Sequence, residues 1–502
     1  MARPKVKIPS PGAPAAETHA GGVLAHTSPA PWWIAFAFLA ALALALIWLP
    51  LARISAHYEI GYNEGWNAYL QQAVAGGGRI YGQAPALVYA NYPPVSFHLV
   101  GLLGRLTNDV NGAGRWVSLV SFFALAFLIG SSVRRLTGSL PSAGFAALTA
   151  VIFIGALKSD RIGMNDPHLL GMAFIAFGFY SYLRASESAR WLYISAVAFA
   201  IGLFTKQSLM AFPAAVGIHL LLTSKKRFTA WLAAAGAASV VLLVLALALD
   251  GPHFLEHLML PRVYSYAFFL SNTVWYLLMF QAAIVISLAW CFRNPGTSLL
   301  VWAFALSHAL AFWFAAGSGA DLNHLFDPIV SLAMIGGLAL PYAVWASQRV
   351  RFGSALLTVL LVVPFSLGVL TMLAPRIQED AATYRAIPQL ERDFAGAVEF
   401  VKSQPGPALC ESLLLCFEAG KPEEYDAFTA DQLVKTGKVP EAAVLRMLDE
   451  RHFSTVQLVM DPGEPLVPAE RPRFSQPFMT RLLADYRPAM RTSSYTIFTP
   501  AR

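Results

Sequence analysis

Long apolar runs separated by short polar joints dominate the pattern of this chain of 502 residues. The first run, residues 31–52, is long enough to cross a bilayer, which takes about 20 apolar residues in a helix. Similar runs follow as far as residue 373. Together they predict about eleven spanning helices, at 31–52, 112–133, 141–158, 167–183, 191–204, 208–223, 229–249, 273–292, 297–315, 325–345 and 353–373.

Composition agrees with a polytopic membrane protein. Hydrophobic residues make up 56% of the chain and charged residues only 13%, whereas a soluble domain carries about 25% charged residues. The net charge of +7 is spread over many short joints, as the positive-inside rule produces. No basic stripe with interleaved aromatic residues is present, so a nucleic-acid partner is not predicted.

The basic residues also predict the orientation. Alternate joints are basic throughout, which predicts that these joints and the N-terminus are cytoplasmic and that the C-terminus lies outside. The basic joints contain Arg134, Arg135, Arg184, Arg190, Lys225, Lys226, Arg227, Arg293, Arg349 and Arg351.

Three regions follow from these patterns. Residues 1–30 are rich in Pro, Ala and Gly and predict a disordered cytoplasmic tail, followed by an uncleaved anchor. Residues 31–375 form the transmembrane domain, with a first outer loop at 54–111. Residues 376–502 are polar with alternating segments such as 455–460, and predict a soluble α/β domain of about 125 residues. Within it, Cys410 and Cys416 can form a disulfide outside the cytoplasm, although their spacing does not decide this.

Acids and histidines gather in the outer joints. Tyr92-Pro93-Pro94 marks a turn before an amphipathic stretch, 95–106, that is too short to span and predicts a juxtamembrane helix on the outer surface. One-sided placement of so many titratable groups predicts a site on the outer face. The groups are Glu64, Asp109, Asp160, Asp166, Lys206, His253, Glu256, His257, Asp321 and His324.

Each charged candidate has a structural alternative. Glu64 is either a general base for a hydroxyl or an acid in the first turn of a helix. Asp166, beside Arg161, is a site acid, a helix cap before Pro167, or both. Lys206 either binds a phosphate or extends its amine to the membrane surface. Asp321, His324 and Asp327 do not match a known metal-ligand spacing, so a metal site stays open.

In order and loop length, these segments resemble the GT-C superfamily of integral-membrane glycosyltransferases. The likeness is to the branch that contains the lipid A aminoarabinose transferase and the protein O-mannosyltransferases, and covers about residues 32–373. It depends on Asn63-Glu64 in the first outer loop, Tyr92-Pro93-Pro94, Gly114-Arg115, Asn165-Asp166-Pro167 and Lys206. The expected architecture is an all-α polytopic domain of GT-C type with a small C-terminal α/β extracytoplasmic domain.

The resemblance implies an inverting transfer of a sugar from a polyprenyl-phosphate donor to an extracytoplasmic glycan, lipid or envelope polymer. It implies a bacterial inner membrane, with the C-terminal domain in the periplasm. Glu64 matches the family's first-loop catalytic acid and Asp166 its second acid. Lys206 and Arg161 are implied to bind the donor phosphate. A divalent cation is a candidate cofactor. Candidate substrate-binding residues are Asn63, Tyr92, His257, Asn323 and His324.

Asn63 departs from the paired acids that many members carry, which favours Glu64 as the base and puts in doubt a metal held by adjacent carboxylates. Two other functions compete with this one. One is a lipid or sugar transporter, which would also place ionisable groups among spans. The other is a ligase that uses a diphosphate-linked donor.

Overall fold

The computed structural model describes residues 30–83, 86–294, 298–347, 353–460 and 464–501. Nearly all of the predicted tail at 1–30, and the predicted inner-joint residues Arg349 and Arg351, lie outside these ranges. Every predicted span coincides with a helix. The helices are α2 Ala30–Ala52, α5 Val110–Thr137, α6 Leu140–Lys158, α7 His168–Arg184, α8 Arg190–Leu203, α9 Ala211–Thr223, α10 Lys225–Leu245, α12 Tyr266–Arg293, α13 Leu299–Ala315, α14 Phe326–Ser347 and α15 Gly353–Ser403.

In the part of the chain that the structure describes, six helical segments are long and apolar enough to cross a membrane. They lie at Trp33–Ala52, Val110–Thr137, Leu140–Arg161, Lys225–Asp250, Tyr266–Arg293 and Leu322–Ala343. The chain is therefore a multi-pass membrane protein, as its pattern predicts. The total of eleven spans stays a prediction, because several of the other helices, such as α8 and α9, are shorter apolar segments.

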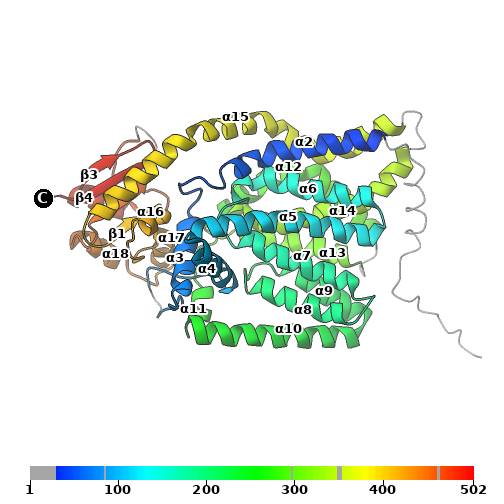
Figure 1. Cartoon of the computed structure of the whole chain (residues 1–502), viewed down its shortest axis with the longest axis horizontal. Helices are drawn as coiled ribbons and strands as arrows, with labels where there is room; N and C mark the ends of the chain where they lie inside the picture. Colours follow the sequence, from blue (N-terminus) through cyan, green and yellow to red (C-terminus); the bar gives the residue numbers. More distant parts are fainter. Residues whose placement is uncertain (1–29, 84–85, 295–297, 348–352, 461–463, 502) are drawn as a thin grey trace, which may run out of the picture.

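The long helices lie roughly side by side, and the C-terminal sheet sits beyond one end of them (Figure 1). The first outer loop supplies α3 Asn63–Ala75 and α4 Val95–Thr107 at that same end. The predicted juxtamembrane helix is thus confirmed as a helix. Short elements complete this end of the bundle: the 3-10 helices η1 Ser159–Arg161 and η3 Leu322–Leu325, the π-helix η2 Ala246–Asp250, and α11 Phe254–Leu258.

The C-terminal region is a small α/β unit, as predicted. Its four-stranded sheet has the order β1-β2-β4-β3, in which β1 and β2 are parallel and the other neighbours antiparallel. The strands are β1 Ala408–Cys410, β2 Thr455–Val459, β3 Tyr486–Arg491 and β4 Tyr495–Pro500. The helices are α16 Leu413–Glu418, α17 Ala427–Lys435, α18 Glu441–Asp449 and α19 Gln476–Asp485. The predicted boundary at residue 375 falls inside α15, which runs from the membrane domain to this unit (Figure 1).

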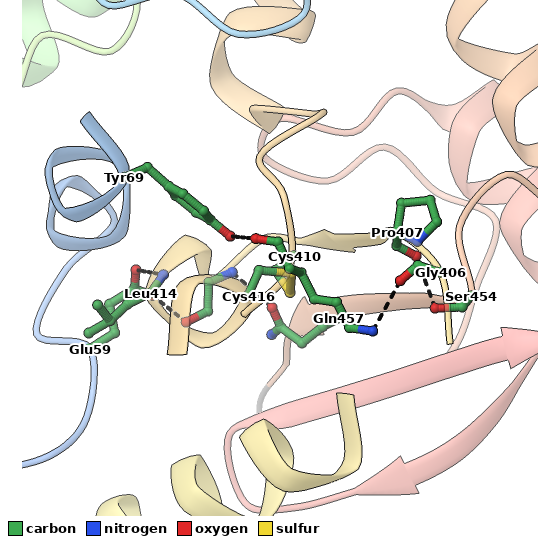
Figure 2. Close-up of a disulfide and its surroundings, with 11 residues drawn as sticks. Glu59, Tyr69, Gly406, Pro407, Cys410, Leu414, Cys416, Ser454 and Gln457 are labelled. Carbon is green, nitrogen blue, oxygen red and sulfur yellow. Dashed lines mark hydrogen bonds between the residues drawn. A yellow bond between two sulfur atoms is a disulfide. The ribbon is translucent and has the colours of Figure 1, made fainter. Parts of the chain in front are cut away.

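Cys410 and Cys416 form a disulfide, the alternative that their spacing left open. The bond links the end of β1 to α16, and side chains of the first outer loop reach the same place (Figure 2). The Tyr69 hydroxyl donates to the Lys421 carbonyl at 2.8 Å, and a Glu59 carboxylate oxygen accepts from the Leu414 amide at 3.1 Å. The disulfide therefore stiffens the segment on which the first outer loop docks.

The first outer loop is held to the membrane helices by a buried ion pair between Glu64 and Arg115. Arg115 is in the first turns of α5 and donates to both Glu64 oxygens, from Nε at 2.7 Å and from Nη2 at 2.8 Å. The same guanidinium donates to the carbonyls of Ala56 and Tyr58. Glu64 also accepts from the Ile60 amide at 2.7 Å and the Asn165 amide at 3.2 Å. Glu64 therefore organises residues 56–64 around α5.

Replacing Glu64 by Gln should destabilise the protein strongly. Glu64 is 0% exposed and Arg115 is 2% exposed, so the substitution leaves a buried guanidinium without its counter-charge, at a cost of about 3–5 kcal/mol. Thermal unfolding in detergent measures the effect. Glu187→Gln is the matched control, because Glu187 pairs with Arg135 and Arg184 at the surface and its loss should matter little. Equal melting temperatures for the two variants would contradict this role of Glu64.

A second contact between distant segments joins α4 to η2, which continues α10. His98 Nε2 lies 2.8 Å from Asp250 Oδ1, and the Asp250 carbonyl accepts from the amides of Ile80 and Tyr81 at 3.0 and 2.9 Å. The hydrogen bond to Asp250 raises the pKa of His98 above its ordinary value, against an opposing effect of partial burial. Protonation of His98 therefore strengthens the attachment of the first outer loop.

Because of the pair between His98 and Asp250, the free energy of unfolding should fall as pH rises. A raised pKa in the folded state means that the contribution is complete below the unfolded-state pKa, about 6.5, and is lost as pH rises through the folded-state pKa. The melting temperature of the wild type should exceed that of His98→Gln by more at about pH 5.5 than at about pH 8.5. A difference that stays constant between these pH values would rule out the titration of His98.

Candidate active site

A cluster of charged side chains surrounds Asp166, just before α7. Asp166 Oδ2 accepts from Asn63 Nδ2 at 2.7 Å and from Arg161 Nη1 at 2.8 Å. Its Oδ1 accepts from the His168 amide at 2.8 Å, which caps the first turn of α7. Gly163 makes the preceding turn possible with a φ of 71°. Asp166 is thus both the helix cap and the centre of a polar site, the two roles that the sequence allowed together.

Lys206 approaches this carboxylate from the turn between α8 and α9. Its Nζ is 4.0 Å from Asp166 Oδ1 and 3.5 Å from the Tyr92 hydroxyl, and it lies 4.5 Å from the centre of the Tyr92 ring. Only 9% of the side chain is exposed. These contacts are long for an ammonium group, which normally forms bonds of about 2.7–2.9 Å to a carboxylate. Lys206 is therefore a buried cation with spare bonding capacity.

Arg161 connects two outer joints through the same cluster. Besides Asp166, its Nε donates to Asp321 Oδ2 at 2.9 Å, and Lys158 Nζ lies 3.2 Å from Asp160 and 3.5 Å from Asp321. Burial would raise the pKa of Asp166, but Lys206 and Arg161 outweigh it and hold that pKa below its ordinary value. In Asp321, the effects of Arg161 and Lys158 likewise exceed that of burial, and its pKa is lowered. Both carboxylates are ionised at neutral pH.

Two histidines border the cluster with unused ring nitrogens. His324 Nδ1 bonds to the Asp321 carbonyl, while its Nε2 is buried without a hydrogen-bond partner among the described residues. A carbonyl can only accept, so Nδ1 carries the proton and Nε2 keeps its lone pair. Both nitrogens of His168 are likewise buried and unpartnered there. Burial lowers the pKa of both rings, and each also interacts electrostatically with Lys206, which acts in the same direction.

The hydrogen bonds of Glu64 and Asp166 bear on which of these two acids can act as a general base. An ionised carboxylate has about four lone-pair positions, and Glu64 uses them on Arg115 Nε and Nη2 and on the amides of Ile60 and Asn165. Asp166 accepts three hydrogen bonds, which leaves one position on Oδ1, the oxygen that faces Lys206. These contacts disfavour the sequence-based assignment of Glu64 as the base and favour Asp166.

The remaining predicted residues divide into two groups. Asn63, Tyr92 and His324 belong to the cluster, and Asn323 lies beside His324 in η3 and is buried. His257 does not belong to it. Its Nδ1 accepts from the Ala90 amide at 3.0 Å, its Nε2 bonds to the Gly82 carbonyl at 2.9 Å, and its ring stacks on Tyr89. His257 therefore shapes the first outer loop rather than contacting the charged cluster.

Sequence reasoning missed the roles of Arg115 and His168. Gly114-Arg115 stood out only as the start of a span, and an arginine within a span is itself a signal that a buried partner exists. His168 carried no signal beyond its place after Asp166-Pro167. In the described part of the chain, no group of three or more His, Cys, Asp or Glu is arranged to hold a metal ion. The divalent cation stays a prediction.

The chain is similar to known proteins in the sequence of its central helices and in its fold. Residues 91–249 match the family model described as dolichyl-phosphate-mannose-protein mannosyltransferase. A comparison with curated protein sequences gave no match. The fold is similar to that of ArnT from Cupriavidus metallidurans bound to undecaprenyl phosphate, with a TM-score of 0.58 and 15% identity over 94% of this chain and 98% of that chain.

A second similar structure is the oligosaccharyltransferase AglB from Archaeoglobus fulgidus, in complex with an inhibitory peptide and a dolichol-phosphate. The TM-score is 0.54 and the identity 9%, over 85% of this chain and 69% of that chain. The shared fold extends over almost the whole chain in the case of ArnT, and the family model covers its central helices. The chain therefore has the fold of ArnT and AglB, and its central helices match a mannosyltransferase family model.

Proposed function

We propose that the protein transfers a sugar from a polyprenyl-phosphate donor to a hydroxyl of an extracytoplasmic acceptor, with inversion at the anomeric carbon. The observation that carries the proposal is the pairing of a buried, loosely bonded Lys206 with the ionised Asp166, 4.0 Å away. A phosphate oxygen would give Lys206 the short charge-assisted bond that its present contacts lack. The undecaprenyl phosphate in ArnT and the dolichol-phosphate in AglB support a donor of this class.

The reaction is a direct displacement. The acceptor oxygen attacks the anomeric carbon, and the bond from that carbon to the phosphate oxygen breaks. Asp166 takes the hydroxyl proton on Oδ1, the oxygen with a free lone-pair position. Lys206 and Arg161 stabilise the charge that develops on the departing polyprenyl phosphate. Asn63 donates to the other Asp166 oxygen and so orients the base.

A small, mostly apolar pocket lies between α5, α7, α9 and α14. It is lined by Leu125, Ile129, Met172, Ile175, Phe179, Phe212, Asp327, Val330 and Met334, among others. Asp327 is one turn beyond His324 along the chain, so one end of the pocket lies close to the charged cluster.

The proposed site faces the outer side of a bacterial inner membrane, with the N-terminus in the cytoplasm. The disulfide between Cys410 and Cys416 supports this orientation, because structural disulfides persist in oxidising compartments such as the periplasm. The basic residues of the opposite joints support it independently.

Lys206→Met should abolish transfer without unfolding the protein. Removing the cation removes the stabilisation of the leaving phosphate, which is worth about 10²–10³-fold in rate for a single group of this kind. Release of polyprenyl phosphate from a polyprenyl-phosphate sugar, measured in detergent, gives the rate. Lys226→Met is the matched control, since Lys226 is exposed at the far end of α10. Wild-type rates in Lys206→Met would overturn the donor assignment.

Asp166→Asn should lower the rate by about 10²–10⁴-fold, the usual contribution of a general base. Asparagine keeps the shape and its oxygen can still cap α7, while its amide nitrogen loses the bond from Asn63. Arg161 keeps Asp321 as a counter-charge, whereas Arg115 has only Glu64, so the melting temperature should fall less than in Glu64→Gln. The comparison separates the two acids: loss of activity at normal stability indicates a base, and loss of both indicates a structural pair. If Glu64→Gln kept normal stability but lost activity while Asp166→Asn stayed active, the assignments would have to be exchanged.

A further inference from the structure

The disulfide loop, residues 410–416, is a part of the C-terminal unit that packs tightly against the first outer loop. Its two cysteines join the end of β1 to α16 (Figure 2). A Cβ atom on Gly65 would lie only 2.0 Å from the Leu414 nitrogen, so the two backbones are in direct contact here. The cysteines are 1% and 3% exposed and share a hydrophobic cluster with Ala68 of α3. Opening of this contact would therefore expose the disulfide to water.

Glu59 of the first outer loop holds the disulfide loop by two hydrogen bonds. Its Oε1 accepts from the Leu414 amide at 3.1 Å, and its Oε2 accepts from the Ser412 hydroxyl (Figure 2). Gln457 of β2 fixes the same segment, because its side-chain oxygen accepts from the Ser412 amide at 2.8 Å. One carboxyl group thus joins the first outer loop to a segment that the disulfide and the sheet hold in place.

The charges around Glu59 do not include a counter-ion of its own. In the described part of the chain, Glu59 forms no ion pair. Titratable groups that interact electrostatically with it are Glu64, Arg473 and Tyr495. Glu64 is already paired with Arg115, and Arg473 lies 3.8 Å from Glu411. Glu59 is therefore an acid in a partly buried contact that other groups do not neutralise.

This environment brings the titration of Glu59 close to neutral pH. Burial raises the pKa of Glu59 to about 7, although the hydrogen bonds from Ser412 and Leu414 oppose the shift. The protonated carboxyl can donate to the Ser412 oxygen and still accept from the Leu414 amide, so both contacts survive in the neutral form. Because the pKa is raised in the docked state, protonation favours docking. Its contribution is complete below the pKa of a solvated glutamate, about 4.3, and is lost as pH rises to about 7.

The segment that Glu59 holds leads directly into the charged cluster. Glu59 lies four residues before Asn63, and Asn63 donates to Asp166 at 2.7 Å. Tyr62, between them, also contacts the C-terminal unit, because its hydroxyl donates to Asp426. The docking of this segment on the C-terminal unit therefore bears on the position of Asn63.

We propose that Glu59 is a positioning residue that holds the first outer loop on the disulfide loop, and that this hold tightens when Glu59 is protonated. The inference rests on the proposed glycosyl transfer, because the held segment carries Asn63, which orients the base Asp166. Ionisation of Glu59 loosens the contact, so that Asn63 orients Asp166 in fewer molecules and turnover slows. Lys206 and Arg161 are not part of the contact, so binding of the donor phosphate stays the same. Transfer is therefore faster in mildly acidic surroundings.

Reduction of the disulfide measures the opening of this contact without any substrate. The full-length protein in detergent is treated with a water-soluble phosphine, and the new thiols are trapped and counted by mass spectrometry. Glu59→Gln imitates the protonated acid, so the ratio of the wild-type rate to the Glu59→Gln rate cancels the pH dependence of the reagent and of His98. This ratio should rise by about tenfold or more between about pH 5 and about pH 8. Glu399→Gln is the matched control, since Glu399 is exposed on α15 and the variant should follow the wild type.

Turnover should follow the same titration through kcat. Between about pH 5 and about pH 8, the wild-type kcat for release of polyprenyl phosphate should fall by about twofold or more relative to Glu59→Gln, with the donor KM unchanged. Ser412→Ala removes a bond that stabilises the ionised form of Glu59. It should therefore move the upper end of the titration to higher pH, and it supplies the same measurement if Glu59→Gln does not fold.

The two measurements separate failure of the inference from failure of the proposed function. A ratio of reduction rates that stays constant with pH would overturn the role of Glu59 in docking. A ratio that rises while the kcat values of the two proteins stay parallel would overturn its role as a positioning residue. If the opening depends on Glu59 but the wild type releases no polyprenyl phosphate at any pH, the docking contact stands and the glycosyl transfer is wrong.

Discussion

The bidentate pair between Glu64 and Arg115 is the interaction on which the end of the molecule with the charged cluster depends. Four backbone groups of the first outer loop and of the α7 entry meet at these two residues: the carbonyls of Ala56 and Tyr58 and the amides of Ile60 and Asn165. Neither partner can be solvated, so each needs the other. Asn63 precedes Glu64, and Asn165, whose amide donates to Glu64, precedes Asp166. The same contacts therefore set the distance between the first outer loop and Asp166.

The charges of the cluster around Asp166 nearly cancel, but one cation in it has unused hydrogen-bonding capacity. Arg161 is held firmly by Asp166 and Asp321, and Lys158 is shared between Asp160 and Asp321. Lys206 alone among these cations has only contacts of 3.5 Å or more within the described residues. Arg161 therefore positions Asp166, while Lys206, with spare donors, is the group that the proposed transfer assigns to the donor phosphate. Rigid donors that need no rearrangement are what stabilise a developing charge most effectively.

The C-terminal unit is part of this arrangement rather than a separate appendage. The Tyr62 hydroxyl donates to Asp426 and accepts from the Phe428 amide, and the Arg473 guanidinium stacks 3.8 Å from the centre of the Tyr62 ring. On the other side, Gln432 bonds to the Ser318 hydroxyl at 3.1 Å. Tyr62 precedes Asn63 and Ser318 lies three residues before Asp321. Docking of the C-terminal unit thus restrains both outer joints that enter the cluster.

The sequence by itself determined the membrane class, the positions of the helices and the identity of most polar residues in the cluster. This is possible because a bilayer admits only long apolar helices, so hydrophobicity and length carry the information locally. Asp166, Arg161, Lys206, Asn63, Tyr92 and His324 were all predicted as site residues from the sequence, and the structure brings them together in one cluster. Tertiary structure alone decided how they pair. Glu64 and Arg115 are 51 residues apart in sequence. No local pattern therefore predicts that each uses up the hydrogen-bonding capacity of the other. The choice between a structural acid and a proton acceptor depends on which lone pairs remain free, and that follows only from contacts between distant segments.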